Sequence, residues 1–196
     1  MSMSELYNTE RPEPIPLEQH QRRRLEKDTQ EIIACGKKRG VSEATIRSAI
    51  EQLQLLLPDI LNLHRLSAAS WVAILSDAGS IPIKLITVKD AYPGADIGIL
   101  FQNQPRMLLS SPETLQQDAA LVLAMLKGAS DPSAIIQSCP DLATPATLSR
   151  CLAHIQSTHL GKNPVEVLER YPDVLRDMGE SRVELTAEYG EMTTRD

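Results

Sequence analysis

Apolar residues recur along this chain at the spacing of one helix face. The clearest run begins after Ser42, has apolar side chains three and four positions apart, and is closed by Pro58. Its members are Ile46, Ala49, Ile50, Leu53, Leu56 and Leu57. Because residues i, i+3 and i+4 lie on one side of an α-helix, the pattern predicts an amphipathic helix capped by Ser42.

Further helices are predicted on both sides of this one. The spacing predicts a helix over residues 17–35, broken by Gly36 and Gly40, and another around Ala68 to Ala78. The segment from Ile81 to Pro93 has the β-branched content of a strand. Since the neighbouring patterns are helical, we expect a helix there as well.

In the second half of the chain, residues that can cap a helix directly precede prolines. Three such pairs are Ser111-Pro112, Thr144-Pro145 and Asn163-Pro164. Proline is favoured at the first helical position because the N–H that it lacks would have no partner there. Each pair therefore predicts the start of a helix.

Prolines also recur at the predicted ends of helices, in the segments LLLPDIL, QNQPRML, QSCPDLA and ERYPDVL. They are Pro58, Pro105, Pro140 and Pro172. Each has an aliphatic residue five positions before it and apolar residues two and three positions after it. A proline inside a helix costs about 3 kcal/mol, so each is expected to end one. The recurrence predicts helix pairs that bury their apolar faces by stacking.

This organisation resembles the mitochondrial transcription termination factor (mTERF) family, whose helical repeats place a leucine three positions after a proline. The matching pairs are Pro58 with Leu61, Pro105 with Leu108, Pro172 with Leu175 and, less closely, Pro140 with Ala143. The resemblance covers residues 43–175. It implies a right-handed α-superhelix that works in mitochondria or chloroplasts, on organellar DNA or RNA or on ribosome assembly through a protein partner.

The predicted fold class is therefore all-α, a short helical-repeat solenoid. We expect an extended proline-rich arm over residues 1–16, a basic helix over 17–40, a helical repeat domain over 41–176 and an acidic tail over 177–196. The composition agrees with helix-on-helix packing, since 42% of residues are hydrophobic and only 3% are aromatic.

Net charge and targeting signals bear on partners and on compartment. A net charge of −6 argues against a chain that binds polyanions over its whole surface. No apolar run is long enough for a membrane span, so we expect no membrane insertion. The N-terminal residues form no hydrophobic signal and include Glu5, Glu10 and Glu13. The sequence alone thus favours the cytoplasm, whereas the resemblance implies an organelle.

The candidate nucleic-acid contacts lie in one segment. They are Arg22, Arg23, Arg24, Lys27, Lys37, Lys38 and Arg39, and against four acidic residues they give residues 17–39 a net charge of +3. Such a patch can contact phosphates. The alternative is a solvated helix stabilised by ion pairs between residues four apart.

Catalytic and metal chemistry find little support. Cys139, Cys151, His154 and His159 lie close in sequence but lack the spacing of a zinc site, so we expect core thiols and no metal. Cys35 lies near cations without an identifiable histidine and acid. We expect no enzyme and no cofactor. Two functions remain open, an mTERF-like factor that binds nucleic acid with a protein partner, and a protein-only scaffold subunit of a large assembly.

Overall fold

The computed structural model describes residues 17–158 and 161–171. Every regular element in these residues is helical, so the predicted all-α class is confirmed for this part of the chain. The arm over residues 1–16, Pro172, Leu175 and the tail over residues 177–196 lie outside the described residues and stay predictions. The elements are α1 (Leu17–Lys38), α2 (Glu43–Leu56), α3 (Ala68–Ser76), η2 (Ala78–Ser80), α4 (Ile81–Ala91), α5 (Ile97–Asn103), η3 (Pro105–Leu109), α6 (Pro112–Met125), α7 (Pro132–Ser138), η4 (Pro140–Ala143), α8 (Pro145–Thr158) and α9 (Pro164–Arg170), where η denotes a 3₁₀ helix.

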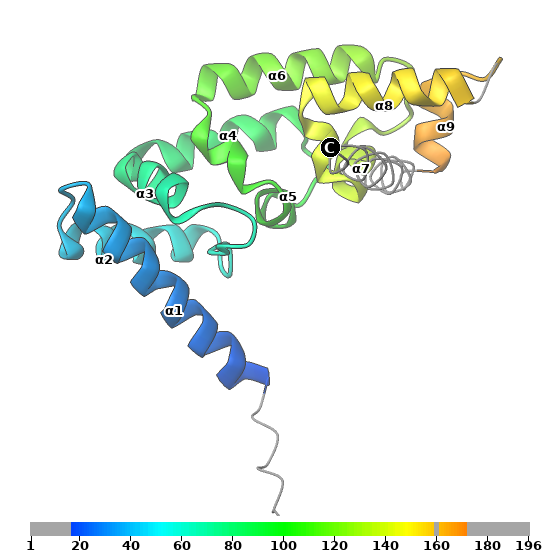
Figure 1. Ribbon diagram of the computed structural model, residues 1–196. Coiled ribbons are helices and arrows are strands. Elements are labelled where there is room, and N and C mark those ends of the chain that lie inside the picture. Colours follow the sequence, from blue (N-terminus) through cyan, green and yellow to red (C-terminus); the bar gives the residue numbers. More distant parts are fainter. Residues whose placement is uncertain (1–16, 159–160, 172–196) are drawn as a thin grey trace, which may run out of the picture.

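From α4 onward the longer helices pack against one another, α4 on α6 and α6 on α8, while the short helices α5 and α7 pack together beside them (Figure 1). At the other end of the molecule, α1 and α2 both pack on α3. The buried apolar side chains of all nine α-helices in the described residues form one continuous core, which holds the two ends together.

Gly36 does not break α1, which continues to Lys38, and the predicted end of the helix at this glycine is wrong. A Cβ atom at Gly36 would lie 2.1 Å from Cδ1 of Ile46, a fully buried residue of α2. The glycine therefore allows α1 and α2 to approach closely. Gly40, with φ of +81°, lies in the turn that separates the two helices.

The ambiguous segment after Ser80 forms α4, as expected. Ile81, Lys84 and Val88 are its buried residues, three and four positions apart, so burial follows the helical period despite the β-branched content. Tertiary packing on α6 thus decides between the two patterns.

Of the predicted caps, those at Ser42, Ser111 and Asn163 are confirmed. The side chains of Ser42 and Ser111 accept hydrogen bonds from backbone N–H groups three residues on, and Asn163 accepts one from Val165. Thr144 directly precedes α8, and Pro145 is its first residue. Ser67, Asp96 and Asp131 also cap helices, although the sequence pattern did not single them out.

The residue before each predicted boundary proline has the same backbone conformation. At Leu57, Gln104, Cys139 and Tyr171, φ lies between −137° and −124° and ψ between 62° and 86°. Each of these residues donates its N–H to the carbonyl four residues earlier over 2.8–3.0 Å. Tyr92, before Pro93, has this geometry too, because a proline ring excludes the helical conformation from the preceding residue. This backbone geometry therefore indicates the end of a helix, and it is not by itself evidence of a repeat.

A stronger recurrence lies in the order and length of the elements. We call α5–η3–α6 the first unit and α7–η4–α8 the second unit. The short helices have seven residues in both units and the long helices have fourteen. The residue three positions after the boundary proline is buried in both, as Leu108 and as Ala143, and Leu61 is buried after Pro58. α9 again has seven residues.

Side chains at one position of the short helices reach back along the chain. The position six residues after the helix cap is occupied by Gln102 in α5, Gln137 in α7 and Glu169 in α9. Gln102 donates to the Pro58 carbonyl over 3.0 Å. Gln137 accepts from the N–H of Asp96, and Glu169 accepts from the N–H of Asp131, so in both cases the donor is the cap of the preceding short helix.

Candidate functional site

The packing of α1 determines which of its basic side chains face outward. Ile32, Ile33 and Gly36 are buried against the neighbouring helices, and so is Asp28, which accepts a hydrogen bond from the Leu63 N–H at 3.4 Å. With about 100° of rotation per residue, the opposite side of α1 presents Arg23, Lys27 and Lys38. The exposed face of the helix is therefore the candidate nucleic-acid interface.

Three of the seven predicted contacts hold the fold together. The guanidinium of Arg24 donates to the Asn62 side chain at 2.9 Å, and that of Arg39 donates to the Ala69 carbonyl at 3.0 Å. Lys37 forms an ion pair with Glu43 at 2.6 Å. Lys37 first, and then Arg47, hold the pKa of the Glu43 carboxyl below its usual value. Through these contacts, α1 and the residue that follows it are joined to α2, to α3 and to the loop between α2 and α3.

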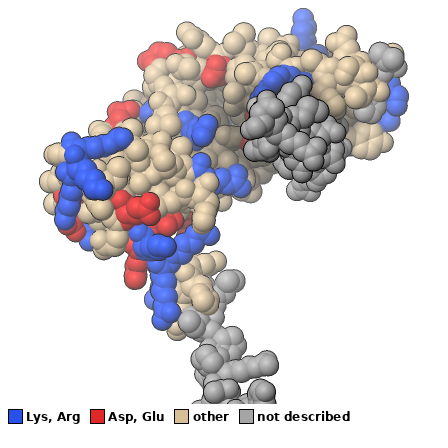
Figure 2. Space-filling view, viewed as in Figure 1, with Lys and Arg blue, Asp and Glu red and all other residues tan. Residues whose placement is uncertain are grey.

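The other four predicted contacts, Arg22, Arg23, Lys27 and Lys38, are exposed and have no hydrogen bond or ion pair with any described residue. Lys27 and Lys38 are separated by eleven positions, about 16 Å along the helix. Figure 2 shows basic side chains at both ends of α1 with acidic side chains between them. The interface is thus two small basic groups and no continuous stripe.

Ion pairs between residues four apart do not stabilise α1 over residues 19–38. The ion pairs of the described residues are Lys37–Glu43, Arg47–Glu43 and Lys84–Asp77, and none of them joins two residues of α1. The alternative interpretation of the basic segment is therefore wrong in its detail for these residues. The free cations of α1 face solvent.

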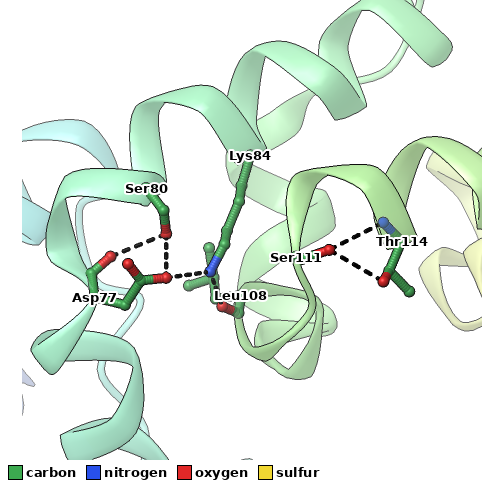
Figure 3. Close-up of polar contacts among 6 residues, drawn as sticks. All are labelled: Asp77, Ser80, Lys84, Leu108, Ser111 and Thr114. Atoms are coloured by element: carbon green, nitrogen blue, oxygen red, sulfur yellow. Dashed lines mark hydrogen bonds and ion pairs between the residues drawn. The ribbon is translucent and has the colours of Figure 1, made fainter.

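Lys84 of α4 is a cation whose side chain is buried. Its Nζ donates to the Leu108 carbonyl at 2.7 Å and lies 3.2 Å from Oδ2 of Asp77 (Figure 3). A hydrogen bond from Ser80, followed by the one from Lys84, lowers the pKa of the Asp77 carboxyl. The lysine joins the corner between α3 and α4 to η3. Figure 3 also shows the nearby cap of α6, where Ser111 accepts from Thr114.

Two further cations bind carbonyl groups in the same manner. Arg65 donates to the carbonyl of Asn103, the last residue of α5, at 3.1 Å. Lys89 donates to the carbonyls of Pro93 and Ala95. The Asn103 carbonyl, at the end of α5, has no partner within the helix, and a cation also interacts favourably with the helix dipole there. Much of the basic content is thus used within the fold.

The cysteines occupy core or partly buried positions. Burial, and then the nearby Asp141 carboxylate, raise the pKa of the Cys139 thiol to about 11. Burial also raises the pKa of Cys151. Within residues 17–158 and 161–171, no three His, Cys, Asp or Glu side chains are grouped to hold a metal ion. His159 lies outside those residues. Both thiols are protonated at neutral pH and suit packing better than nucleophilic chemistry.

An exposed apolar surface lies where the sequence predicted part of a buried stripe. Leu56 is 45% exposed, Leu55 is 84% exposed, and Ile86 of α4 is 60% exposed. Leu56 borders two grooves of about 310 and 330 Å³, one lined also by Ile86 and the other by Leu55 and Pro82. We call Leu55, Leu56, Pro82 and Ile86 the apolar surface. Exposed apolar patches on folded proteins often bind partners.

Two further findings concern membrane spanning and similarity to known proteins. No single helix in the described ranges is both long and apolar enough to cross a bilayer, and the pair that passes by length and composition together, Ala68–Ser76 with Ala78–Ala91, is bent by 71°. Comparison of the chain with family models, curated proteins and solved structures finds no match.

Proposed function

We propose that this chain is a non-enzymatic, mTERF-like factor in organellar gene expression that binds nucleic acid through α1 together with a protein partner. The observation that carries the proposal is a set of four cations of α1 that are exposed and have no partner among the described residues. They are Arg22, Arg23, Lys27 and Lys38. Unpaired, exposed cations can contact phosphates without breaking any contact of the fold.

The repeat architecture of the proposal is supported by the two units. They share element order and helix lengths, and Gln137 and Glu169 accept from the caps of the preceding short helices. Contacts of this kind join each unit to its neighbour, as the stacking of a solenoid requires. A chloroplast or mitochondrion is the compartment that accompanies the resemblance, and it is part of the proposal.

A protein partner belongs to the proposal because α1 alone offers few phosphate contacts. Electrostatic binding weakens steeply with salt, and four contacts on a chain of net charge −6 give modest affinity. The apolar surface supplies a separate place for the partner. Linking two weak contacts in one complex raises the overall affinity without any new contact.

The second candidate is a protein-only scaffold subunit. The observation that favours it is the exposure of Leu55, Leu56 and Ile86, which suits a protein partner and contributes nothing to phosphate binding. In this alternative the four unpaired cations of α1 serve only solubility.

A pull-down of the tagged full-length chain from its native cells, with and without nuclease, separates the two functions. The test variant carries R22Q, R23Q, K27Q and K38Q. The control carries K127Q, R150Q, K162Q and R170Q, which remove the same charge from exposed positions outside α1. We expect the test variant alone to lose its nuclease-sensitive partners. Partners that resist nuclease and are retained by both variants would favour the scaffold.

A further inference from the structure

A cavity of about 380 Å³ lies at the junction of the two units, between α4, η3, α6 and the η4–α8 corner. Its floor is apolar and is formed by the buried side chains of Val88, Leu115, Ala119 and Ala143. Its mouth is polar, since Arg106 and Thr144 are exposed there. Pockets of this size with an apolar floor and a few polar groups are typical of small-molecule sites.

One polar atom of this cavity has no partner. Tyr92 lines the cavity and is only 1% exposed, and its hydroxyl forms no hydrogen bond with any described residue. Burial first, and then the Asp118 carboxylate, raise the pKa of this hydroxyl far above its ordinary value. The hydroxyl therefore stays protonated and lies near Asp118. Buried polar groups in folded proteins are nearly always satisfied, so this one calls for an occupant that can bond to it.

Two unlike charges of the cavity also have no partner among the described residues. Arg106 of η3 and Asp118 of α6 both line it, and neither forms an ion pair or hydrogen bond with a described residue. Among the other polar residues that line the cavity, Gln104 has its amide already bonded to Asp141, and Ser110, Thr144 and Thr147 add hydroxyl groups. An occupant that satisfies both charges must itself carry a positive and a negative group.

We propose that the cavity binds a small zwitterion with an aliphatic body, the chemistry of a free branched-chain amino acid. Its ammonium group pairs with Asp118 and donates to the Tyr92 oxygen. Its carboxylate pairs with Arg106 at the mouth, and its aliphatic body covers the floor at Val88 and Leu115. The site lies apart from α1 and is independent of the proposed nucleic-acid contact.

The test is thermal unfolding and calorimetric titration of the full chain with L-leucine, L-isoleucine and L-valine. Isopentylamine and isovalerate, which carry one charge each, are the matched controls. At least one of the amino acids is expected to raise Tm and to bind more tightly than either control. Failure of all three to bind, or equal binding of the amine or the acid alone, would overturn the proposal.

Three variants locate the binding. Tyr92→Phe keeps the ring and removes the unpartnered hydroxyl, so the unliganded protein stays folded while the amino acid binds about tenfold more weakly, the effect of one lost hydrogen bond. Asp118→Asn and Arg106→Gln are expected to weaken binding further. Tyr171→Phe, which makes the same change at an exposed position outside the cavity, leaves binding unchanged. Unaltered affinity in Tyr92→Phe and Asp118→Asn together would place any bound amino acid elsewhere and refute the site.

Discussion

The side-chain oxygen of Gln137 accepts a hydrogen bond from the backbone N–H of Asp96, although the two residues are 41 positions apart. Asp96 caps α5 with its own side chain, so its N–H and its carboxylate serve two different short helices. Glu169 has the same relationship to Asp131, the cap of α7. The contact between consecutive short helices is therefore made twice, once by an amide and once by a carboxylate.

Replacement of Glu169 tests this contact. Glu169→Gln is expected to cost less than Glu169→Ala at pH 7, because Gln137 shows that an amide oxygen fills the role, whereas Glu169→Ala loses the acceptor for Ser130 and Asp131. The effect is measured as the urea midpoint of unfolding. Equal losses for the two variants would show that the negative charge, and not the acceptor, is what the contact needs.

The same residue gives the protein a pH dependence. Hydrogen bonds from Ser130, its side chain before its backbone, and then from Asp131, lower the pKa of Glu169 from 4.5. A lowered pKa in the folded state adds stability above the unfolded value, and that stability is lost as pH falls through the folded pKa. Relative to wild type, Glu169→Gln should thus lose less stability below pH 4.5. Parallel stability curves for the two proteins would contradict this.

Replacement of Gly36 by alanine is expected to destabilise the protein. Gly36→Ala places a methyl group 2.1 Å from Cδ1 of Ile46, and overpacking of this kind typically costs about 1–3 kcal/mol. Ile46→Val in the same chain removes Cδ1 and should restore part of the loss. Gly79→Ala is the control, since no atom lies within 4 Å of its added Cβ. Chemical denaturation measures all three, and an unchanged midpoint for Gly36→Ala would mean that the Ile46 side chain moves aside at little cost.

Lys84→Met should destabilise the protein because it leaves the Leu108 carbonyl without its buried donor. An unsatisfied buried group costs about 1–3 kcal/mol. The Asp77 side chain is 63% exposed, and exposed ion pairs contribute about 0–1 kcal/mol, so Asp77→Asn should cost less. Denaturant titration compares the two variants. A larger loss in Asp77→Asn would show that the ion pair is the stronger of the two contacts.

The salt dependence of the nucleic-acid binding constant measures how many phosphates α1 contacts. If Arg22, Arg23, Lys27 and Lys38 each neutralise one phosphate, log K against log salt has a slope of about −3.6 on duplex DNA and about −2.8 on single strands. Fluorescence anisotropy with labelled oligonucleotides measures it. Removal of Lys38 alone should reduce the steepness by about 0.9 on duplex, and a slope near zero in the wild type would rule out the interface.

Local signals in the sequence predicted most of the helices. Caps such as Ser42 and boundaries such as Pro105 act within a few residues of themselves, so no knowledge of the fold is needed to recognise them. The exposure of Leu56, the burial of Lys84 and the close approach at Gly36 depend on which helix lies opposite, and periodicity carries no such information.

The candidate site was predicted only in part for a similar reason. Charge and exposure along α1 could be recognised from the sequence, but Arg24 and Arg39 bond to residues that the chain brings near only by folding. The contacts of Gln102, Gln137 and Glu169 had a visible signal, an amide or carboxyl group six residues after each cap. An alignment of the repeats that uses only apolar residues does not detect these polar positions.

The matching of the two units bears on how such a chain can change length. A copy of residues 96–130 inserted after residue 130 would carry its own Gln102 at the position where the second unit now has Gln137. That glutamine has the same amide oxygen to offer to the N–H of Asp96, and the copied Asp96 would in turn meet Gln137. Growth by duplication therefore needs no new contact chemistry, and a lengthened chain would keep its neighbours in register.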